Sequence, residues 1–172
     1  KRGMNAPDRS GAVSFEDVLH ICHAEYLTNG ISSLKQIPSG SIDFVWSHSV
    51  LEHVRKNEFE FVLHEIKRIL KPGSLSSHNI DFQDHLEGAL NNLRFSERVW
   101  ESSFFAESGF YTNRIPAVTM HGMFKAAGFE IKQEAFGQWP ALPTPRSSMH
   151  EDFQAYRDEE LINRTSSVLL MS

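Results

Sequence analysis

The chain has 172 residues, of which 40% are hydrophobic and 23% are charged, and these proportions are typical of one ordinary globular domain. Its formal net charge is −5 and it has no basic stripe, so nucleic acid is not an expected partner. No apolar run reaches the length of a membrane span, so no membrane partner is expected either. The single cysteine, Cys22, excludes an internal disulfide and fits a reducing cytoplasm.

The first part of the chain predicts only short elements. A helix is expected after Ser14, whose hydroxyl can cap the first turn, because the acidic residues that follow favour the positive end of the helix dipole. Residues 25–28 predict a short edge strand and residues 32–35 a helical turn. Because the chain opens on Lys1 and its first residues are polar, we expect it to be a piece of a longer sequence.

The most regular stretch runs from residue 41 to residue 72. Ile42, Phe44, Val45 and Trp46 form a short apolar run that is typical of a strand buried on both faces. From about residue 58 to residue 70, apolar side chains recur at helical spacing, and a second strand is expected at 74–80. A strand that leads through a helix to another strand predicts a crossover and hence a parallel pair.

The second half alternates loops, helices and strands. Pro116 is suited to the first turn of a helix, and Gly128 is suited to its end. The expected elements are a polar loop at 81–94, a helical stretch at 96–108, a helix at 116–127, a strand at 129–136, a proline-rich loop at 137–150, short acidic helices at 151–161 and a strand at 167–171. The predicted class is α/β, with helices flanking a mostly parallel sheet of about five strands whose last pair is antiparallel.

Four segments in this order carry a resemblance to a known family. They read SIDFVWSHSVLEHV, LHEIKRILKPGS, SSHNIDFQDH and FKAAGFEI. In combination they resemble the class I methyltransferases that depend on S-adenosylmethionine (SAM), over about residues 26–171. The resemblance implies a Rossmann-like sheet, SAM as cofactor, and methyl transfer to oxygen or nitrogen of a small polar acceptor, possibly related to a sugar.

The family's glycine-rich SAM loop is missing. Such a loop needs glycines because the backbone approaches the ligand closely, yet no two of the ten glycines here are separated by one residue. The acidic residue that holds the ribose in the family also has no counterpart. We therefore predict one methyltransferase-like domain over residues 1–172 that is truncated at its N-terminus and lacks the family's first two strands.

Carried over by motif, the resemblance implies two groups of cofactor contacts. Asn29, Gly30 and Ile31 match the segment after the family's third strand, which borders adenine. Ser47 and His48 match the end of its fourth strand, which lines the methionine part of SAM.

The chemistry is a direct displacement, for which a protein supplies alignment and a base, and histidine suits the base near neutral pH. The residues assigned by resemblance are His53, His78 and Asp81 for catalysis and His85, Arg94 and Arg114 for acceptor binding. Structural roles for the two catalytic histidines, and solvent exposure for the two arginines, stay open.

Two other functions stay open. Without the glycine loop, the chain would be a non-catalytic or vestigial scaffold that dimerises through a bare sheet edge, and we expect a homodimer because such an edge is a liability. Alternatively, His78, Asp81 and His85 have the chemistry of metal ligands and would serve a metal-dependent enzyme.

Overall fold

The computed structural model describes residue 11 and residues 14–172, and the chain divides into two compact units, Lys1–Gln36 and Ile37–Ser172. In unit 1, helix α1 (Phe15–Ile21) is capped as predicted, because Ser14 and Asp17 exchange hydrogen bonds of 2.9 and 3.1 Å. The 3-10 helix η1 (Gly30–Gln36) confirms the expected turn. The strand predicted at 25–28 is wrong: that backbone is irregular, and the Tyr26 ring lies edge-on to Phe15 at 5.6 Å.

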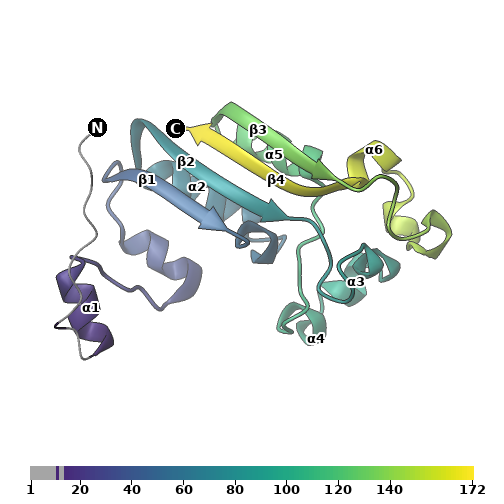
Figure 1. Ribbon diagram of the computed structural model, residues 1–172, viewed down its shortest axis with the longest axis horizontal. Helices are drawn as coiled ribbons and strands as arrows, with labels where there is room; N and C mark the ends of the chain where they lie inside the picture. The colour runs from purple at the N-terminus through teal and green to yellow at the C-terminus, as the bar shows by residue number, and fades with distance from the viewer. Residues whose placement is uncertain (1–10, 12–13) are drawn as a thin grey trace. The chain divides into compact units, whose positions relative to one another are not determined.

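Unit 2 is built on one sheet with the strand order β1-β2-β4-β3 (Figure 1). Its strands are β1 (Ile42–His48), β2 (Leu70–Asp81), β3 (Glu130–Gln138) and β4 (Asn163–Met171). The α/β class, the parallel β1–β2 pair and the antiparallel last pair are confirmed. The described part has four strands rather than about five. It has a single parallel pair, because β4 enters between β2 and β3 and runs antiparallel to both.

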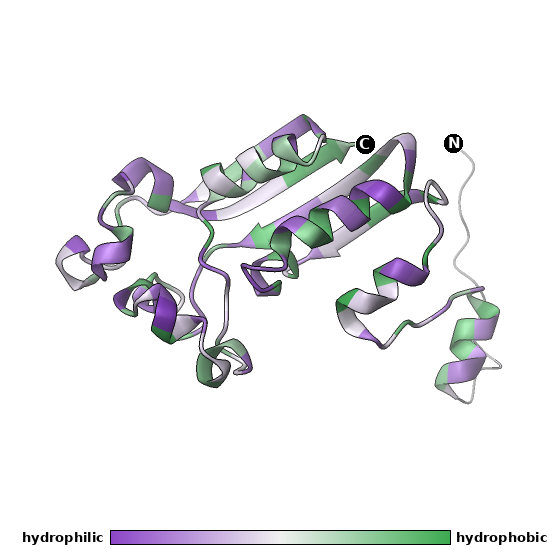
Figure 2. Cartoon of the chain, turned by 180° about the vertical axis from the view of Figure 1, so that it is seen from behind, coloured by the Kyte–Doolittle hydropathy of each residue, from purple (hydrophilic) through white to green (hydrophobic). Residues whose placement is uncertain are grey.

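Two helices cover the same face of this sheet, behind it in Figure 1 and in front of it in Figure 2. Helix α2 (Phe59–Ile69) confirms the predicted amphipathic helix, since every apolar residue at the predicted spacing is buried. Helix α5 (Ala117–Ala126) follows Pro116, as predicted. The two helices meet over the sheet through Phe59 and Phe124, both fully buried, with ring centroids 6.4 Å apart.

The opposite face of β1 differs from the prediction. Phe44 is 53% exposed and Trp46 is 67% exposed, and on the other face Val45 and Ser47 are half-buried, so neither face of the strand is fully buried. The neighbours of Phe44 and Trp46 on β2, Leu75 and Ser77, lie beside them on the same face. Within the described residues of unit 2, no helix lies over these aromatic side chains, and alternation along the strand alone does not reveal that.

Beyond β2 the chain forms a group of short helices that we call the cap, residues 82–116 and 139–162. The predicted helix at 96–108 divides into α3 (Glu97–Trp100) and α4 (Ser103–Ala106). The other cap helices are η3 (Asn91–Arg94), η4 (Arg146–Ser148), η5 (Glu151–Phe153) and α6 (Asp158–Leu161). The cap has its own apolar core, composed of Leu90, Leu93, Met149, Phe153 and Leu161. No helix in the described part of the chain combines the length and apolarity that crossing a membrane requires.

Candidate active site

The site lies where the parallel strands β1 and β2 end side by side. The C-terminal ends of parallel strands are where open α/β sheets bind ligands. Ser49, just beyond β1, has φ +52° and donates its N–H to the carbonyl oxygen of Asn79 at 2.9 Å. This turn directs the chain into the 3-10 helix η2 (Leu51–His53), so that the LEH motif sits beside the end of β2 at Asp81.

Glu52 ties these elements together from a buried position, with 2% of its surface exposed. Its Oε1 accepts the N–H of Asp81 at 3.2 Å, and its carbonyl oxygen accepts the N–H of Asn113 at 2.7 Å. Burial raises the pKa of Glu52, although backbone hydrogen bonds oppose the shift. Sequence reasoning missed this residue; the only signal was an acidic side chain inside the apolar VLEHV segment.

His53 is held with one ring nitrogen free. Its Nδ1 lies 2.9 Å from the carbonyl oxygen of Tyr111, and because a carbonyl only accepts, Nδ1 carries the proton. The lone pair of neutral His53 is therefore on Nε2. His85 lies beside it, with ring centroids 4.9 Å apart, and its Nδ1 is 3.5 Å from the carbonyl oxygen of Gly109. The structure thus brings together two exposed histidines that the sequence assigned separately to catalysis and acceptor binding.

The loop that orients His53 is itself anchored. Tyr111 donates its hydroxyl to the Glu101 carboxylate at 3.1 and 3.2 Å, and that hydroxyl accepts the N–H of Lys56 at 3.2 Å. Burial raises the pKa values of both Tyr111 and Glu101. The phenol therefore stays protonated near neutral pH, and this hydrogen bond persists.

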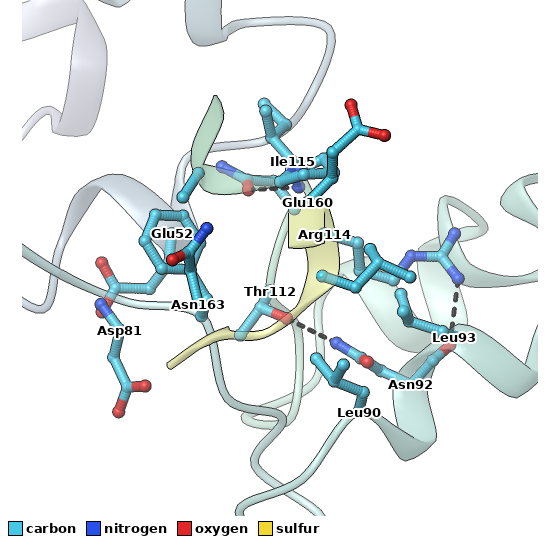
Figure 3. A pocket seen from close by; sticks show the side chains of 15 residues that line it. Glu52, Asp81, Leu90, Asn92, Leu93, Thr112, Arg114, Ile115, Glu160 and Asn163 are labelled. Atoms are coloured by element: carbon cyan, nitrogen blue, oxygen red, sulfur yellow. Dashed lines mark hydrogen bonds between the residues drawn. The ribbon is translucent and has the colours of Figure 1, made fainter. Parts of the chain in front are cut away.

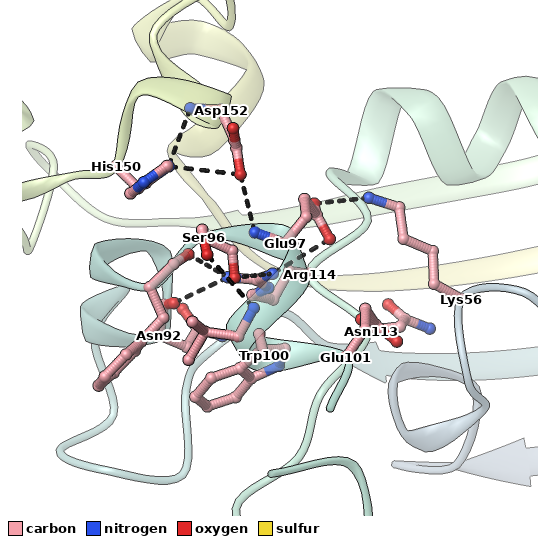
Figure 4. Close-up of polar contacts among 12 residues, drawn as sticks. Lys56, Asn92, Ser96, Glu97, Trp100, Glu101, Asn113, Arg114, His150 and Asp152 are labelled. Carbon is pink, nitrogen blue, oxygen red and sulfur yellow. Dashed lines mark hydrogen bonds and ion pairs between the residues drawn. The ribbon is translucent and has the colours of Figure 1, made fainter. Parts of the chain in front are cut away.

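Arg114 is enclosed by the cap (Figure 4). Its side chain has 0% exposure and donates to the carbonyl oxygen of Asn92 at 3.0 Å and to the Glu97 carboxylate at 3.1 Å. The guanidinium lies 5.2 Å from the Trp100 ring and 4.9 Å from the Phe153 ring. Its backbone is held at φ +57°. Most of its hydrogen-bonding capacity is used to fasten the cap, so Arg114 is not the solvent-exposed residue that the sequence left open.

His78 faces the helix layer rather than the strand ends. It is 2% exposed, its Nδ1 lies 2.7 Å from the Ser47 hydroxyl, and its ring stacks with Phe124 at 6.3 Å. Burial lowers the pKa of His78 to about 4. The same hydrogen bond engages Ser47, whereas His48 is exposed and stacks on Trp46 at 6.3 Å.

The other predicted residues are dispersed. Asp81 accepts from the Gln83 backbone and amide at the end of β2, and Arg94 is exposed on the cap. Asn29, Gly30 and Ile31 lie in unit 1, where Asn29 donates its N–H to Ser33 at 3.1 Å and Gly30 has φ +55°. Among residue 11 and residues 14–172, no three His, Cys, Asp or Glu side chains gather as a metal site.

A Ser–His–Glu set lies between helix α5 and the sheet. His121 Nε2 is 2.9 Å from Ser166 Oγ, and its Nδ1 is 2.9 Å from Glu134. This is the hydrogen-bond order of a hydrolytic triad, but Ser166 is 0% exposed, so no substrate reaches it. The set fastens α5 to β4 and β3.

Unit 2 lacks the glycine-rich loop of the family that the sequence resembles. In residues 37–172, all of which are described, the glycines lie before β1, near the start of β2, in the cap, in or just after α5, and near the end of β3. None stands at the C-terminal end of β1 or β2, where a close backbone approach would require it. These strand ends therefore carry His53 and Glu52 nearby but no glycine that would let the backbone approach a cofactor closely.

The comparisons with known proteins agree with the predicted resemblance. Residues 9–77 match a family model described as a methyltransferase domain. A SAM-dependent methyltransferase from Methanosarcina mazei shares 14% identity and a TM-score of 0.54, with 87% of this chain and 67% of that chain covered. One from Archaeoglobus fulgidus shares 12% identity and a TM-score of 0.53, with 91% and 72% covered. These structures confirm the fold as that of class I methyltransferases.

The chain spans less of some other similar structures. It covers 55% of the length of the Haloferax volcanii protein solved in complex with the Trm112 methyltransferase activator, at 15% identity and a TM-score of 0.44, with 78% of this chain covered. No curated protein matches the sequence. The model match over residues 9–77 and the shared fold agree with the resemblance, and the particular reaction is a matter for proposal.

Proposed function

We propose that this protein takes part in SAM-dependent methyl transfer to oxygen or nitrogen of a small polar acceptor. One observation carries the proposal: at the ends of β1 and β2, His53 is fixed as the tautomer whose Nε2 is a base. The methyltransferase fold of the sheet supports it. When bound, SAM supplies an electrophilic methyl group.

The chain's own residues handle the proton. His53 Nε2 accepts the proton that the acceptor hydroxyl or ammonium loses, and the Tyr111 carbonyl stabilises the resulting imidazolium through its Nδ1–H bond. His85 and Asp81 border the same strand ends and are proposed to orient the acceptor. The proposed cofactor contacts remain Asn29, Gly30, Ile31, Ser47 and His48. Arg94 remains a proposed contact of the acceptor.

The test is transfer of a labelled methyl group from SAM to a panel of alcohols and amines. His53→Gln keeps a similar size and removes the base, so we expect at least a ~100-fold loss of rate, since general bases contribute about 10²–10⁴-fold. His64→Gln, on the exposed side of α2, is the matched control and retains wild-type activity. Activity of His53→Gln within about threefold of wild type, or no transfer by the wild-type chain to any acceptor, would overturn the proposal.

A second candidate is a non-catalytic scaffold that dimerises, and the exposed edge strand β1 favours it. If two copies of β1 pair antiparallel about Val45, Phe44 of one copy lies opposite the partner's Trp46, and the pair repeats by symmetry. Pairing the two β1 strands would satisfy the backbone groups of the bare edge. Light scattering tests this: a dimer that Trp46→Lys converts to monomer supports it, and a monomeric wild-type chain contradicts it.

A further inference from the structure

Two hollows open between the cap and the segment that follows β1. The first is a pocket at the end of β2 (Figure 3), and Glu52 and Arg114 are part of its lining. Its volume is about 30 Å³, which is room for about one water molecule, so it is too small for a methyl acceptor. The second is a cleft of about 290 Å³, which is large enough for a small organic molecule.

The cleft is lined by Arg55, Lys56 and Asn57, which follow the LEH motif, and by Glu101 of the cap. Tyr111 connects its two sides. The Tyr111 hydroxyl accepts the N–H of Lys56 at 3.2 Å and donates to the Glu101 carboxylate at 3.1 and 3.2 Å. Hydrogen bonds therefore hold the two walls of the cleft beside each other.

Arg55 carries the unpaired charge of this lining. The Lys56 ammonium lies 2.7 Å from the Glu97 carboxylate (Figure 4), and the Glu101 carboxylate accepts the Tyr111 hydroxyl. Arg55 is half-buried, and no carboxylate among residue 11 and residues 14–172 forms an ion pair with it. A guanidinium that lines a cleft without a carboxylate partner favours an anionic ligand, because its planar fork of N–H groups matches two oxygen atoms.

The charges of the lining favour an anion with a single negative charge. Arg55 and Lys56 are positive and Glu101 is negative, so one further negative charge balances the three. A phosphate ester carries about −1.5 to −2 near neutral pH, and the Glu101 carboxylate would repel it more strongly than it repels a carboxylate. The cleft therefore suits a carboxylate better than a phosphate.

The cleft lies beside the proposed base. Because His53 and Arg55 are two residues apart, their Cα atoms are at most about 7 Å apart. Tyr111 contributes to both places, since its carbonyl oxygen lies 2.9 Å from His53 Nδ1 and its hydroxyl connects the walls of the cleft. A ligand anchored at Arg55 is therefore held by the same short segment that carries the base.

We propose that this cleft binds the carboxylate of the methyl acceptor, a short hydroxy acid, with the carboxylate at the Arg55 guanidinium and the hydroxyl toward His53 Nε2. The Asn57 amide, in the same lining, can donate a further hydrogen bond to the carboxylate. The inference names the acceptor class of the proposed methyl transfer. It rests on that function for the role of the ligand but not for its binding.

Binding is tested without SAM by titrating three small molecules into the ¹⁵N-labelled full chain. They are 3-hydroxypropanoate, its neutral amide 3-hydroxypropanamide, and the dianionic 2-hydroxyethyl phosphate. We expect the hydroxy acid to bind with a roughly millimolar or lower Kd, the scale that its few atoms permit. The amide should bind at least ~10-fold more weakly, because it cannot make charge-assisted hydrogen bonds as an acceptor. The resonances of the Arg55 Nε–H and of the Lys56 and Asn57 backbone amides should shift.

The variant that tests the carboxylate end is Arg55→Gln, which removes the charge and keeps a hydrogen-bond donor. It should weaken the hydroxy acid at least ~10-fold and change the amide less than about threefold, whereas a merely structural role of Arg55 would affect both ligands alike. Arg55→Lys restores the charge without the planar fork and should recover part of the affinity for the acid. Arg164→Gln, exposed on β4, is the control and leaves both affinities unchanged. The dispersion of the Arg55→Gln spectrum shows whether the variant is folded.

Three results would overturn the inference. Equal affinity for the amide would show that the cleft does not recognise a carboxylate, and tighter binding of the phosphate would show that it recognises another anion. No shift at residues 55–57 with any of the three molecules, at concentrations well above the expected Kd, would show that the cleft is not a site for them. The labelled-methyl assay is separate: binding without methylation would count against the proposed function only, and faster methylation of acceptors without a carboxylate would count against this inference only.

Discussion

Acidification should weaken the fold through His78. The imidazole is buried between the sheet and α5 and accepts or donates one short hydrogen bond with Ser47. Its folded-state pKa of about 4 lies below the ordinary value of 6.5 because burial penalises the charged form. Between these values the unfolded chain binds a proton that the folded chain does not, so stability rises with pH across this window and is lost as pH falls.

The magnitude follows from the same difference in pKa. One pKa unit is about 1.4 kcal/mol, so lowering the pH from 7.5 to 4.5 removes about 3 kcal/mol of the free energy of unfolding through this residue. That is a large share of the stability of a typical domain, which is about 5–15 kcal/mol. Other groups titrate in the same range, and a comparison with a non-titrating variant removes their contribution.

The assay is urea unfolding of the wild type and His78→Asn at several pH values. Asparagine keeps a polar atom near the Ser47 hydroxyl and does not titrate. The wild type should be more stable at pH 7.5, and its advantage should shrink by about 3 kcal/mol at pH 4.5. His64→Asn, exposed on α2, is the control and should show no such change. An advantage that stays constant from pH 7.5 to pH 4.5 would refute the reasoning.

The remaining predictions concern packing. In Gly137→Ala, the new methyl group would clash with Thr165 Oγ1 on β4, so thermal unfolding should show a loss of about 1–3 kcal/mol. The control is Gly122→Ala on α5, where the new methyl group would have no neighbour within 4 Å. It should gain about 0.5–1 kcal/mol of stability from helix propensity. Equal effects of the two changes on stability would contradict the predicted clash at Gly137. Arg114→Lys keeps the charge but loses the planar contacts to the carbonyls and to Trp100, so it should cost about 2 kcal/mol or more. A stability equal to wild type would show that Arg114 does not fasten the cap.

Local sequence signals predicted the unit β1–α2–β2 well. The apolar spacing of α2 and the stop at its end are local features, and the parallel crossover follows from the order of the elements. The cap of α1 at Ser14 was predictable for the same reason, since it involves residues three apart. The single parallel pair was not predictable, because the insertion of β4 beside β2 depends on residues about ninety positions apart.

In the candidate site too, local features were predictable from the sequence, and contacts between distant residues were not. The LEH motif drew attention to His53, and its tautomer comes from Tyr111, 58 residues away. Glu52 and Arg114 line the same pocket only because the cap packs against the strand ends. Sequence reasoning therefore missed Glu52 and expected the Arg114 side chain to be more exposed to solvent than it is. His78 was placed at a strand end, but alternation along β2 turns its side chain to the helices.

The most direct test of a methyltransferase function is isothermal titration of SAM, and of its demethylated product, into the full chain. The account predicts saturable binding with a micromolar Kd for both ligands. Absence of heat for both ligands at concentrations far above that range, with a folded chain in the cell, would contradict it.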